Sequence, residues 1–252
     1  MGFAVSADAY DRFMGRYSIR LAPGFADFAG VVSGQRVLDV GCGPGALTGE
    51  LVTRVGAEAV SAVDPSESFV AAVSRRCRGV DVRRVAAEGL PFEDGAFDTA
   101  LAQLVVHFMA DPVRGLGEMR RATRQGGVVA ACVWDHAGRG GPLSAFWQVA
   151  RELDPDAGDE SDLAGTREGH LAELLAEAGL RDVESAVLSV GVEHPSFEEW
   201  WEPFTLGVGP AGAYVLGLDL ADQDGLREHC REILPAAPFT VTARAWAARG
   251  IR

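Results

Sequence analysis

The residues best suited to chemistry stand in one short stretch, residues 37–48, which reads VLDVGCGPGALT. An acid, Asp39, lies within a short apolar run and is followed by glycines at alternate positions, Gly41, Gly43 and Gly45. Glycines leave a groove free of side chains, in which a ligand can lie against the backbone. A helix that begins there offers unpaired N–H groups and a positive dipole end, which suit a carboxylate or a phosphate. The stretch therefore predicts a loop that binds a small-molecule cofactor.

A second acid, Asp64, ends the next predicted strand. A carboxylate at that place can accept hydrogen bonds from both hydroxyls of a ribose. The alternative is a helix cap, a role that Ser66 fits better than Asp64 does. The glycine loop reads G-x-G-x-G where a dinucleotide site would need G-x-G-x-x-G, and Pro44 removes one N–H donor. These two features favour a ligand that is less anionic than a dinucleotide.

Alternating strand and helix patterns predict the scaffold that positions these residues. The predicted strands are 36–40, 59–63, 81–86, 97–103 and 127–134, with helices near 46–54, 66–76 and 112–123 between them. Such alternation indicates an α/β fold with a doubly wound parallel sheet. Ligands of these sheets bind at the carboxyl ends of the strands, near the switch in strand order.

Further elements flank this core. A helix is predicted over 7–29, broken near Pro23; after the core come helices at 143–153, from a Thr166 cap to Gly179, at 196–206 and at 222–233, and strands at 181–192 and 239–247. We expect residues 1–34 to form a helical lid and residues 35–135 a cofactor-binding core. Residues 136–252 are expected to complete the sheet, with helical substrate-cap insertions at about 136–165 and 193–236.

The composition is typical of a globular protein with an excess of acidic residues. Its 252 residues carry a formal net charge of −13, and 48% of them are hydrophobic. The charge disfavours a nucleic acid as partner, and no apolar run approaches the ~20 residues of a membrane span. The four cysteines form no CxxC pair, so we expect reduced thiols and no metal site. The first residues lack the pattern of a secretory signal, which favours a cytoplasmic protein.

Together and in this order, these stretches resemble the class I S-adenosylmethionine-dependent methyltransferases, in the small-molecule branch that includes ubiquinone- and menaquinone-biosynthesis enzymes. The resemblance covers about Tyr10 to Trp134. It rests on the VLDVGCGPG loop, Asp64, the segment 87–92, the pair Phe97-Asp98, the run 118–121 and the pair Gly126-Gly127. Residues 10–18 also resemble the helix that closes over the cofactor in this branch.

The resemblance implies a Rossmann-like, mostly parallel seven-stranded sheet with an antiparallel last strand and helical lid insertions. It implies S-adenosyl-L-methionine as the cofactor, bound by a set of residues near the strand ends: Tyr10, Arg16, Asp39, Gly41, Cys42, Gly43, Gly45, Asp64, Pro65, Ser66, Ala87, Glu88, Gln103 and Leu104. Arg16 would pair with the methionine carboxylate. Many relatives carry an Asp where this chain has Ala86, so adenine recognition would rely on backbone groups or Glu88.

The catalytic candidates are His107 and Asp135. His107 lies just after the fourth predicted strand, where relatives carry a histidine. It is either a base, with an ordinary pKa near 6.5, or a residue that merely packs under the cofactor. Asp135 is expected to orient the histidine or to bind substrate, with a simple loop acid as the alternative. The substrate walls are expected to include Tyr17, Trp134, Trp201 and Phe204, for which core packing is the other interpretation.

The sequence thus predicts methyl transfer to a small-molecule acceptor, a hydroxyl of an aromatic or other secondary metabolite, by in-line displacement. Nitrogen and carbon acceptors remain open. The alternatives are a non-catalytic cofactor-binding or regulatory protein of the same fold and a nicotinamide-dependent oxidoreductase. A homodimer is compatible with these residues, which do not decide the oligomeric state.

Overall fold

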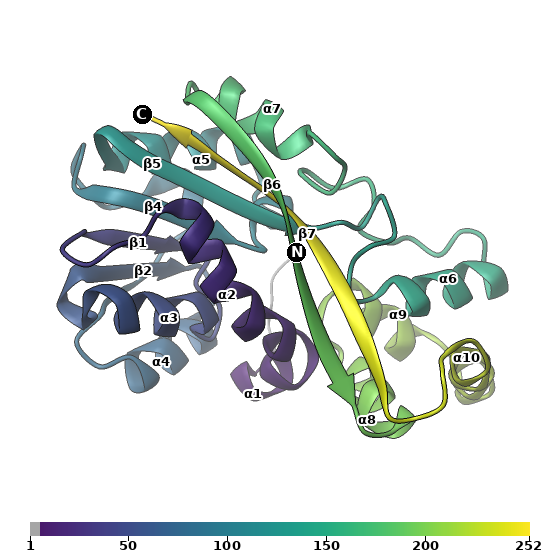
Figure 1. Cartoon of the computed structure of the whole chain (residues 1–252). Coiled ribbons are helices and arrows are strands. Elements are labelled where there is room, and N and C mark those ends of the chain that lie inside the picture. Colours follow the sequence, from purple (N-terminus) through teal and green to yellow (C-terminus); the bar gives the residue numbers. More distant parts are fainter. Residues whose placement is uncertain (1–5) are drawn as a thin grey trace.

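A seven-stranded sheet in the order β3-β2-β1-β4-β5-β7-β6 runs through the protein. The computed structural model describes residues 6–252 (Figure 1). The strands are β1 (Val37–Val40), β2 (Val60–Asp64), β3 (Asp81–Arg84), β4 (Phe97–Gln103), β5 (Thr123–Trp134), β6 (Arg181–His194) and β7 (Phe239–Ile251). Strands β1 to β5 pair in parallel, and β7 pairs antiparallel with both β5 and β6. The predicted Rossmann-like sheet with an antiparallel last strand is confirmed.

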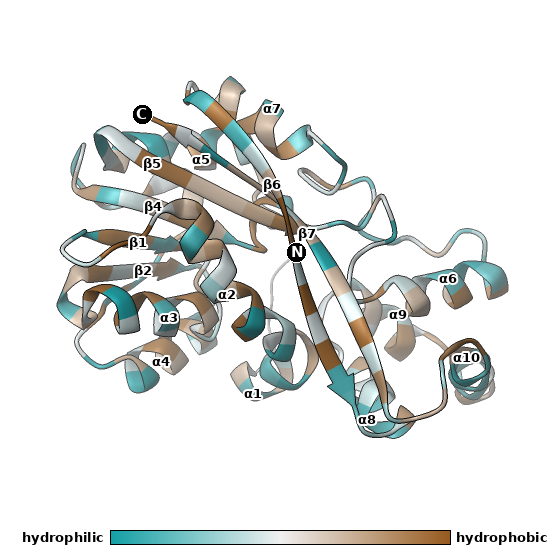
Figure 2. Ribbon diagram, in the orientation of Figure 1, coloured by the Kyte–Doolittle hydropathy of each residue, from teal (hydrophilic) through white to brown (hydrophobic). Residues whose placement is uncertain are grey.

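Helices cover both faces of the sheet (Figure 1). One face packs against α2 (Arg16–Ala29), α3 (Ala46–Val55) and α4 (Glu67–Arg76), and the other against α5 (Pro112–Ala122) and α7 (His170–Glu177). Because every second residue of a strand points to the same face, two apolar cores form, one on each side. The inner strands are accordingly the most hydrophobic ribbons in Figure 2, whereas the helices show polar outer faces.

Four short helical turns connect these elements or precede them. They are α1 (Ala7–Tyr10), η2 (Ala57–Ala59), η3 (Ala87–Gly89) and η4 (Val106–Phe108). The last two follow the carboxyl ends of β3 and β4, so they lie at the edge of the sheet where ligands bind in folds of this kind.

The N-terminal helical segment continues without a break through Pro23. After α1, a π-helical turn η1 (Asp11–Gly15) leads directly into α2, and Pro23 stands inside that helix. The predicted break near Pro23 is therefore wrong. The carbonyl group that Pro23 leaves without an N–H partner belongs to Ile19, which is 59% exposed, so water can satisfy it.

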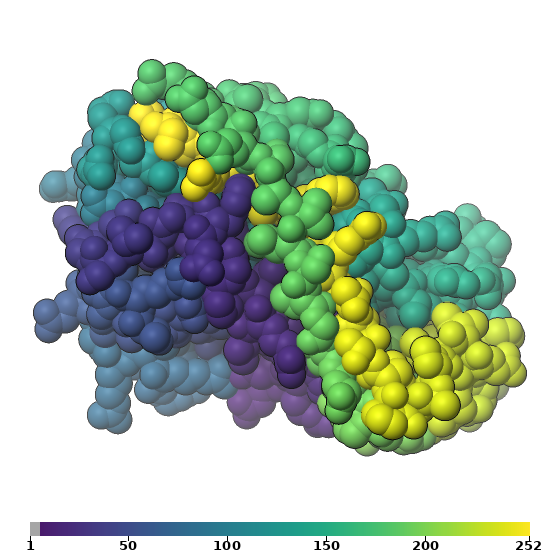
Figure 3. Space-filling model, viewed as in Figure 1, coloured from purple at the N-terminus to yellow at the C-terminus, as the bar shows by residue number. Residues whose placement is uncertain are grey.

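The C-terminal half adds a helical cap beside the sheet. It comprises α6 (Ser144–Leu153), α8 (Phe197–Trp201), η5 (Glu202–Leu206), α9 (Gly209–Gly217) and α10 (Leu220–Ile233). The long ends of β6 and β7 reach this cap, and the N-terminal helices lie between it and the core (Figures 1 and 3). Aromatic contacts hold the cap together, with Phe146 stacked on Phe204 at 4.5 Å between ring centroids.

Two predictions in this half are wrong in detail. The sequence analysis missed α9, because its glycines and Pro210 resemble a loop. Thr166 does not cap α7; its hydroxyl donates to the carbonyl groups of Ser161 and Leu163, and the N-cap is Gly169. Within residues 6–252, no helix combines the length and the apolarity needed to cross a bilayer.

Candidate functional site

A cavity of about 830 Å³ opens at the carboxyl ends of β1, β2 and β4. Strand β1 lies between β2 and β4, so the strand order reverses at this point and leaves a crevice outside the strand ends. The loops after the strands supply the lining, which includes Tyr10, Gly41, Gly43, Asp64, Pro65, Ser66, Ala87, Glu88, Gln103 and Leu104.

The glycine loop approaches its neighbours too closely for side chains. Gly41 has a φ of +70°, and a Cβ atom there would lie 2.3 Å from a methyl group of Val105. Gly43 also has a positive φ, but a Cβ atom there would meet no atom within 4 Å. Gly41 is therefore required by packing, whereas Gly43 keeps the cavity wall open for a ligand.

Two backbone N–H groups fix the Asp64 carboxylate at the end of β2. Gly43 donates to its Oδ2 at 2.9 Å, and Ser66 donates to its Oδ1 at 2.8 Å. Burial raises the pKa of Asp64, while these two hydrogen bonds counteract the rise. A carboxylate oxygen can accept more than one hydrogen bond. Both oxygens of Asp64 can therefore accept a further hydrogen bond from a ligand's hydroxyl group.

Gln103 provides an acceptor with no partner of its own. Its Nε2 donates to the Ser18 carbonyl at 3.1 Å, and its Oε1 is buried with no hydrogen bond. A buried oxygen without a donor is costly unless a ligand supplies one. The unpaired oxygen, the fixed Asp64 carboxylate and the bare glycine backbone together fit a ligand with a ribose and an amino group, as in S-adenosylmethionine.

Asp39 lies beneath the loop instead of in the cavity. It is 1% exposed, and the Thr48 hydroxyl donates to its Oδ2 at 2.6 Å. Burial raises the pKa of Asp39 to about 7, and the charge of Asp64 contributes to the rise. Its position supports the loop and the start of α3, and the residue does not line the large cavity.

A second, much smaller cavity of about 30 Å³ adjoins the first. Tyr10, Leu104 and Phe108 line both cavities, so the two meet at these residues. The small cavity lies between the core, the N-terminal helices and the cap, and its other walls include Phe13, Met14, His107, Trp134, His136, Leu143, Glu160 and Val208.

His107 is a buried neutral histidine in the wall of this small cavity. It is 7% exposed, and its Nδ1 has no hydrogen-bond partner. Burial holds the pKa of His107 well below its usual value, and the nearby ring of His136, at 5.9 Å between centroids, lowers it further. The ring is therefore uncharged at neutral pH.

Four residues predicted to bind the cofactor do not line the large cavity: Arg16, Asp39, Cys42 and Gly45. Arg16 forms an ion pair with Glu199 and approaches Nδ1 of His194, so it joins α2 to the cap. Cys42 packs inward on Ala62, and Gly45 borders a separate surface groove. The expected pairing of Arg16 with the cofactor carboxylate does not match these contacts.

Asp135 also differs from the prediction. Its carboxylate forms an ion pair with Arg244 at 2.7 Å and accepts hydrogen bonds from Trp246 Nε1 and the Gly138 N–H group. It makes no hydrogen bond with His107. Arg244 lies on β7, far from Asp135 in the sequence, and no local pattern predicts this ion pair. The contacts of Asp135 therefore do not match the expected role of orienting His107.

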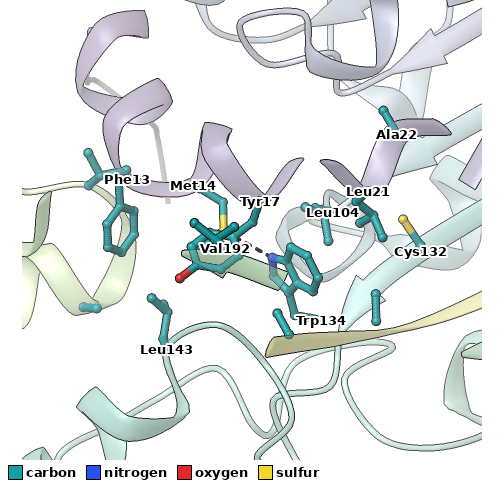
Figure 4. Packing of buried hydrophobic residues seen from close by; sticks show 14 of the residues in the cluster. Phe13, Met14, Tyr17, Leu21, Ala22, Leu104, Cys132, Trp134, Leu143 and Val192 are labelled. Atoms are coloured by element: carbon teal, nitrogen blue, oxygen red, sulfur yellow. Dashed lines mark hydrogen bonds between the residues drawn. The ribbon is translucent and has the colours of Figure 1, made fainter. Parts of the chain in front are cut away.

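The four predicted substrate-wall residues are all buried in one hydrophobic cluster. Figure 4 shows Tyr17 and Trp134 within it. Only Trp134 lines the small cavity, where its Nε1 donates to the Met14 sulfur at 3.2 Å. Tyr17 and Phe204 border a void of about 10 Å³ that also touches Arg16. Trp201 packs on Phe197 and lines neither cavity.

The sequence analysis missed much of both linings. In the large cavity these residues include Glu67, Phe69, Arg84, Val105, Phe108 and Met109, and in the small one Phe13, Met14, His136, Leu143, Glu160 and Val208. Apart from Arg84, which lies inside the predicted strand 81–86, the first group follows predicted strand ends, which was a usable signal. The second comes from segments far apart in the sequence, which no local pattern brings together.

Comparison with known proteins agrees with this geometry. A family model described as a methyltransferase domain matches residues 38–131. The chain is 31% identical over 165 residues to a phosphatidylethanolamine N-methyltransferase from Cereibacter sphaeroides, covering 63% of this chain and 76% of that protein. It is 28% identical over 188 residues to a demethylmenaquinone methyltransferase from Renibacterium salmoninarum, covering 69% and 78% respectively.

Two further similarities differ in extent. The match to a ubiquinone biosynthesis O-methyltransferase from Rhizobium johnstonii is 35% over 119 residues, and it spans 46% of this chain and 47% of that protein. Among solved structures, the YcgJ protein from Bacillus subtilis superposes with a TM-score of 0.60 at 18% identity, covering 94% of this chain and 98% of that chain. The chain belongs to the class I S-adenosylmethionine-dependent methyltransferases. The family assignment favours S-adenosyl-L-methionine, the methyl donor of this family, over a dinucleotide.

Replacing Asp39 by Asn should change how stability depends on pH. An unfolded aspartate releases its proton near pH ~4, whereas the pKa of buried Asp39 is about 7. Between these values the unfolded chain binds fewer protons, so wild-type stability falls as pH rises, by at most ~1.4 kcal/mol per pH unit. Denaturant unfolding from about pH 4 to pH 8 should show a flatter profile for Asp39→Asn. The exposed control Glu93→Gln should retain the wild-type slope.

Replacing Asp64 by Ala should weaken cofactor binding at least about tenfold, or ~1.4 kcal/mol. The change removes the acceptors expected for two ribose hydroxyls, and hydrogen bonds to charged groups contribute ~1.5–3 kcal/mol each. Calorimetric titration with S-adenosylhomocysteine measures the effect, with the exposed Glu58→Ala as control. An affinity within about threefold of wild type, a difference of ~0.6 kcal/mol, would mean that Asp64 does not hold the ribose.

Proposed function

We propose that the protein transfers a methyl group from S-adenosylmethionine to a hydroxyl group of a small aromatic or other secondary metabolite. The observation that carries the proposal is the cavity at the strand-order switch, whose lining brings together Asp64, with its carboxylate fixed by backbone N–H groups, Gln103, whose buried Oε1 has no partner among the described residues, and Gly43. Two relatives, one named an N-methyltransferase and the other an O-methyltransferase, support the reaction class. Because they differ in the acceptor atom, the hydroxyl acceptor is argued from the site itself.

The cavity residues divide the recognition of the cofactor among them. Asp64 would accept from the ribose hydroxyls, and Gln103 Oε1 would accept from the amino group of the methionine part. Glu88 is less suited to adenine, because its Oε1 already accepts from the N–H groups of Ala110 and Asp111. Backbone groups near Ala87 would then recognise adenine. The neighbouring position, Ala86, is where many relatives carry an Asp.

The bound cofactor supplies a methyl group on a sulfonium, which is already activated for displacement. The protein therefore needs chiefly to hold the acceptor oxygen in line with that methyl group, which can contribute several kcal/mol. A hydroxyl group must also lose its proton. We assign this proton to the unpaired Nδ1 of His107, which is neutral at pH 7 because its pKa lies well below the usual value.

The N-terminal segment is suited to exclude water from this reaction. Tyr10 lines both cavities, and Asp11 forms an ion pair at 2.6 Å with Arg76, which also donates to the Pro44 carbonyl of the glycine loop. We propose residues 1–34 as the lid, of which 1–5 lie outside the described residues. Residues 35–135 would form the cofactor core and residues 136–252 the sheet completion and cap. Water exclusion strengthens polar contacts inside the closed site.

Replacing His107 by Asn should slow methyl transfer by about 10²–10⁴-fold, the usual contribution of a general base. Affinity for the cofactor should stay at the wild-type value, because His107 does not line the large cavity. Labelled S-adenosylmethionine and a panel of phenolic and alcoholic metabolites measure the rate, with exposed His229→Asn as the matched control. An unchanged rate in His107→Asn would mean that the histidine is not the base and only packs in the cavity wall.

A further inference from the structure

Glu160 is a buried acid that the proposed methyl transfer does not use. It lies in the segment between α6 and α7, is 4% exposed, and lines the small cavity. Its Oε2 accepts a hydrogen bond from Trp147 Nε1 at 3.0 Å, the one side-chain hydrogen bond that the carboxylate makes in the described part of the chain. No arginine lines the small cavity, and the chain contains no lysine. Among residues 6–252, Glu160 therefore has no cationic partner.

The other titratable groups around the cavity are neutral or already paired. Burial lowers the pKa of His136 to about 4 and that of His107 well below 6.5, and it raises the pKa of Tyr10 to about 12. Asp159, beside Glu160, forms an ion pair with Arg151, and Asp135 forms one with Arg244. Among the described residues that line the cavity, Glu160 is thus the acid available to a positive charge without an ion pair of its own.

The other walls of the small cavity suit a cation as well. Phe13, Phe108 and Trp134 present aromatic rings, whose faces attract positive charge. The cavity volume of about 30 Å³ is that of a few small polar atoms, since one water molecule needs ~10–15 Å³ on this measure. The small cavity therefore fits a small cationic group, while a ring attached to that group would lie in the direction of the large cavity.

We propose that the small cavity is a subsite for a primary ammonium group of the methyl acceptor, with the Glu160 carboxylate as its counter-ion. The inference rests on the proposed function and narrows its substrate class to small amines that also carry a hydroxyl. An ammonium group paired with Glu160 has no free electron pair, so it cannot accept the methyl group. A hydroxyl group elsewhere on the same molecule then remains as the acceptor.

Three phenols of matched size and different charge test the subsite: tyramine, 4-ethylphenol and 3-(4-hydroxyphenyl)propionate. They are titrated into protein saturated with S-adenosylhomocysteine, at about pH 8, where Glu160 is ionised. We expect tyramine to bind at least about tenfold (~1.4 kcal/mol) more tightly than the neutral phenol, and the anion to bind more weakly still. Equal affinities, or no binding of tyramine up to about 10 mM, would overturn the proposal.

A pair of variants assigns the preference to Glu160. Glu160→Gln keeps an oxygen for the Trp147 N–H group but removes the charge, and it should reduce the preference for tyramine to within about twofold. Asp162→Asn removes a charge from an exposed residue of the same segment and should leave the preference intact. A tyramine preference that survives in Glu160→Gln would contradict the assignment.

The pH dependence separates this role from a structural one. Burial raises the pKa of Glu160 to about 7, so below that pH the amine must displace a proton on binding. Wild-type affinity for tyramine should fall from about pH 8 to pH 6, with proton release visible as a buffer-dependent heat at the lower pH. Glu160→Gln should show neither effect, and a wild-type profile without them would count against the ion pair.

Cofactor binding is measured first in every variant. Absence of S-adenosylhomocysteine binding by the wild-type protein would count against the proposed function itself. Normal binding of that compound together with no preference for the amine would overturn the ammonium subsite alone.

Discussion

The site depends on the way in which backbone N–H groups hold the Asp64 carboxylate. The N–H group of Gly43 comes from the loop after β1, and that of Ser66 comes from the chain directly after β2, so one side chain joins both strand ends. A buried carboxylate is costly without such donors. The loop can approach Asp64 only because Gly41 has no side chain where Val105 packs. The chain's own hydrogen bonds and packing therefore hold this wall of the cavity in place, which lowers the entropic cost of binding.

The second constraint is the set of polar contacts that joins the N-terminal helices to the cap and to the glycine loop. Arg12 and Arg16 reach Glu202 and Glu199 of the cap, whereas Arg76 connects Asp11 to the glycine loop. The same segment thus contacts the cofactor core on one side and the acceptor side on the other. Tyr10 lies where the two cavities meet. A change in the position of Tyr10 would consequently alter the shape of both cavities.

The sequence predicted what local patterns determine. Strand periodicity and the glycine loop identified the parallel core, and Asp64 is where the ribose acid was expected, because the carboxyl ends of neighbouring parallel strands share one edge. The contacts of Asp135 and Arg16 could not be predicted in this way. Their partners, Arg244 and Glu199, are far away in the sequence and reach them only through the long β6–β7 pair. Glu160 stands in an acid-rich segment, 154–162, and only tertiary packing reveals that it is buried.

The most direct test of the whole account is a crystal structure of the protein soaked with S-adenosylmethionine. We expect density for the cofactor over the glycine loop, with both ribose hydroxyls within hydrogen-bond distance of the Asp64 carboxylate. The amino group should lie beside Gln103 Oε1, and the methyl group should point towards the side of His107. A cofactor bound elsewhere, or a crevice that stays closed to it at saturating concentration, would contradict the account.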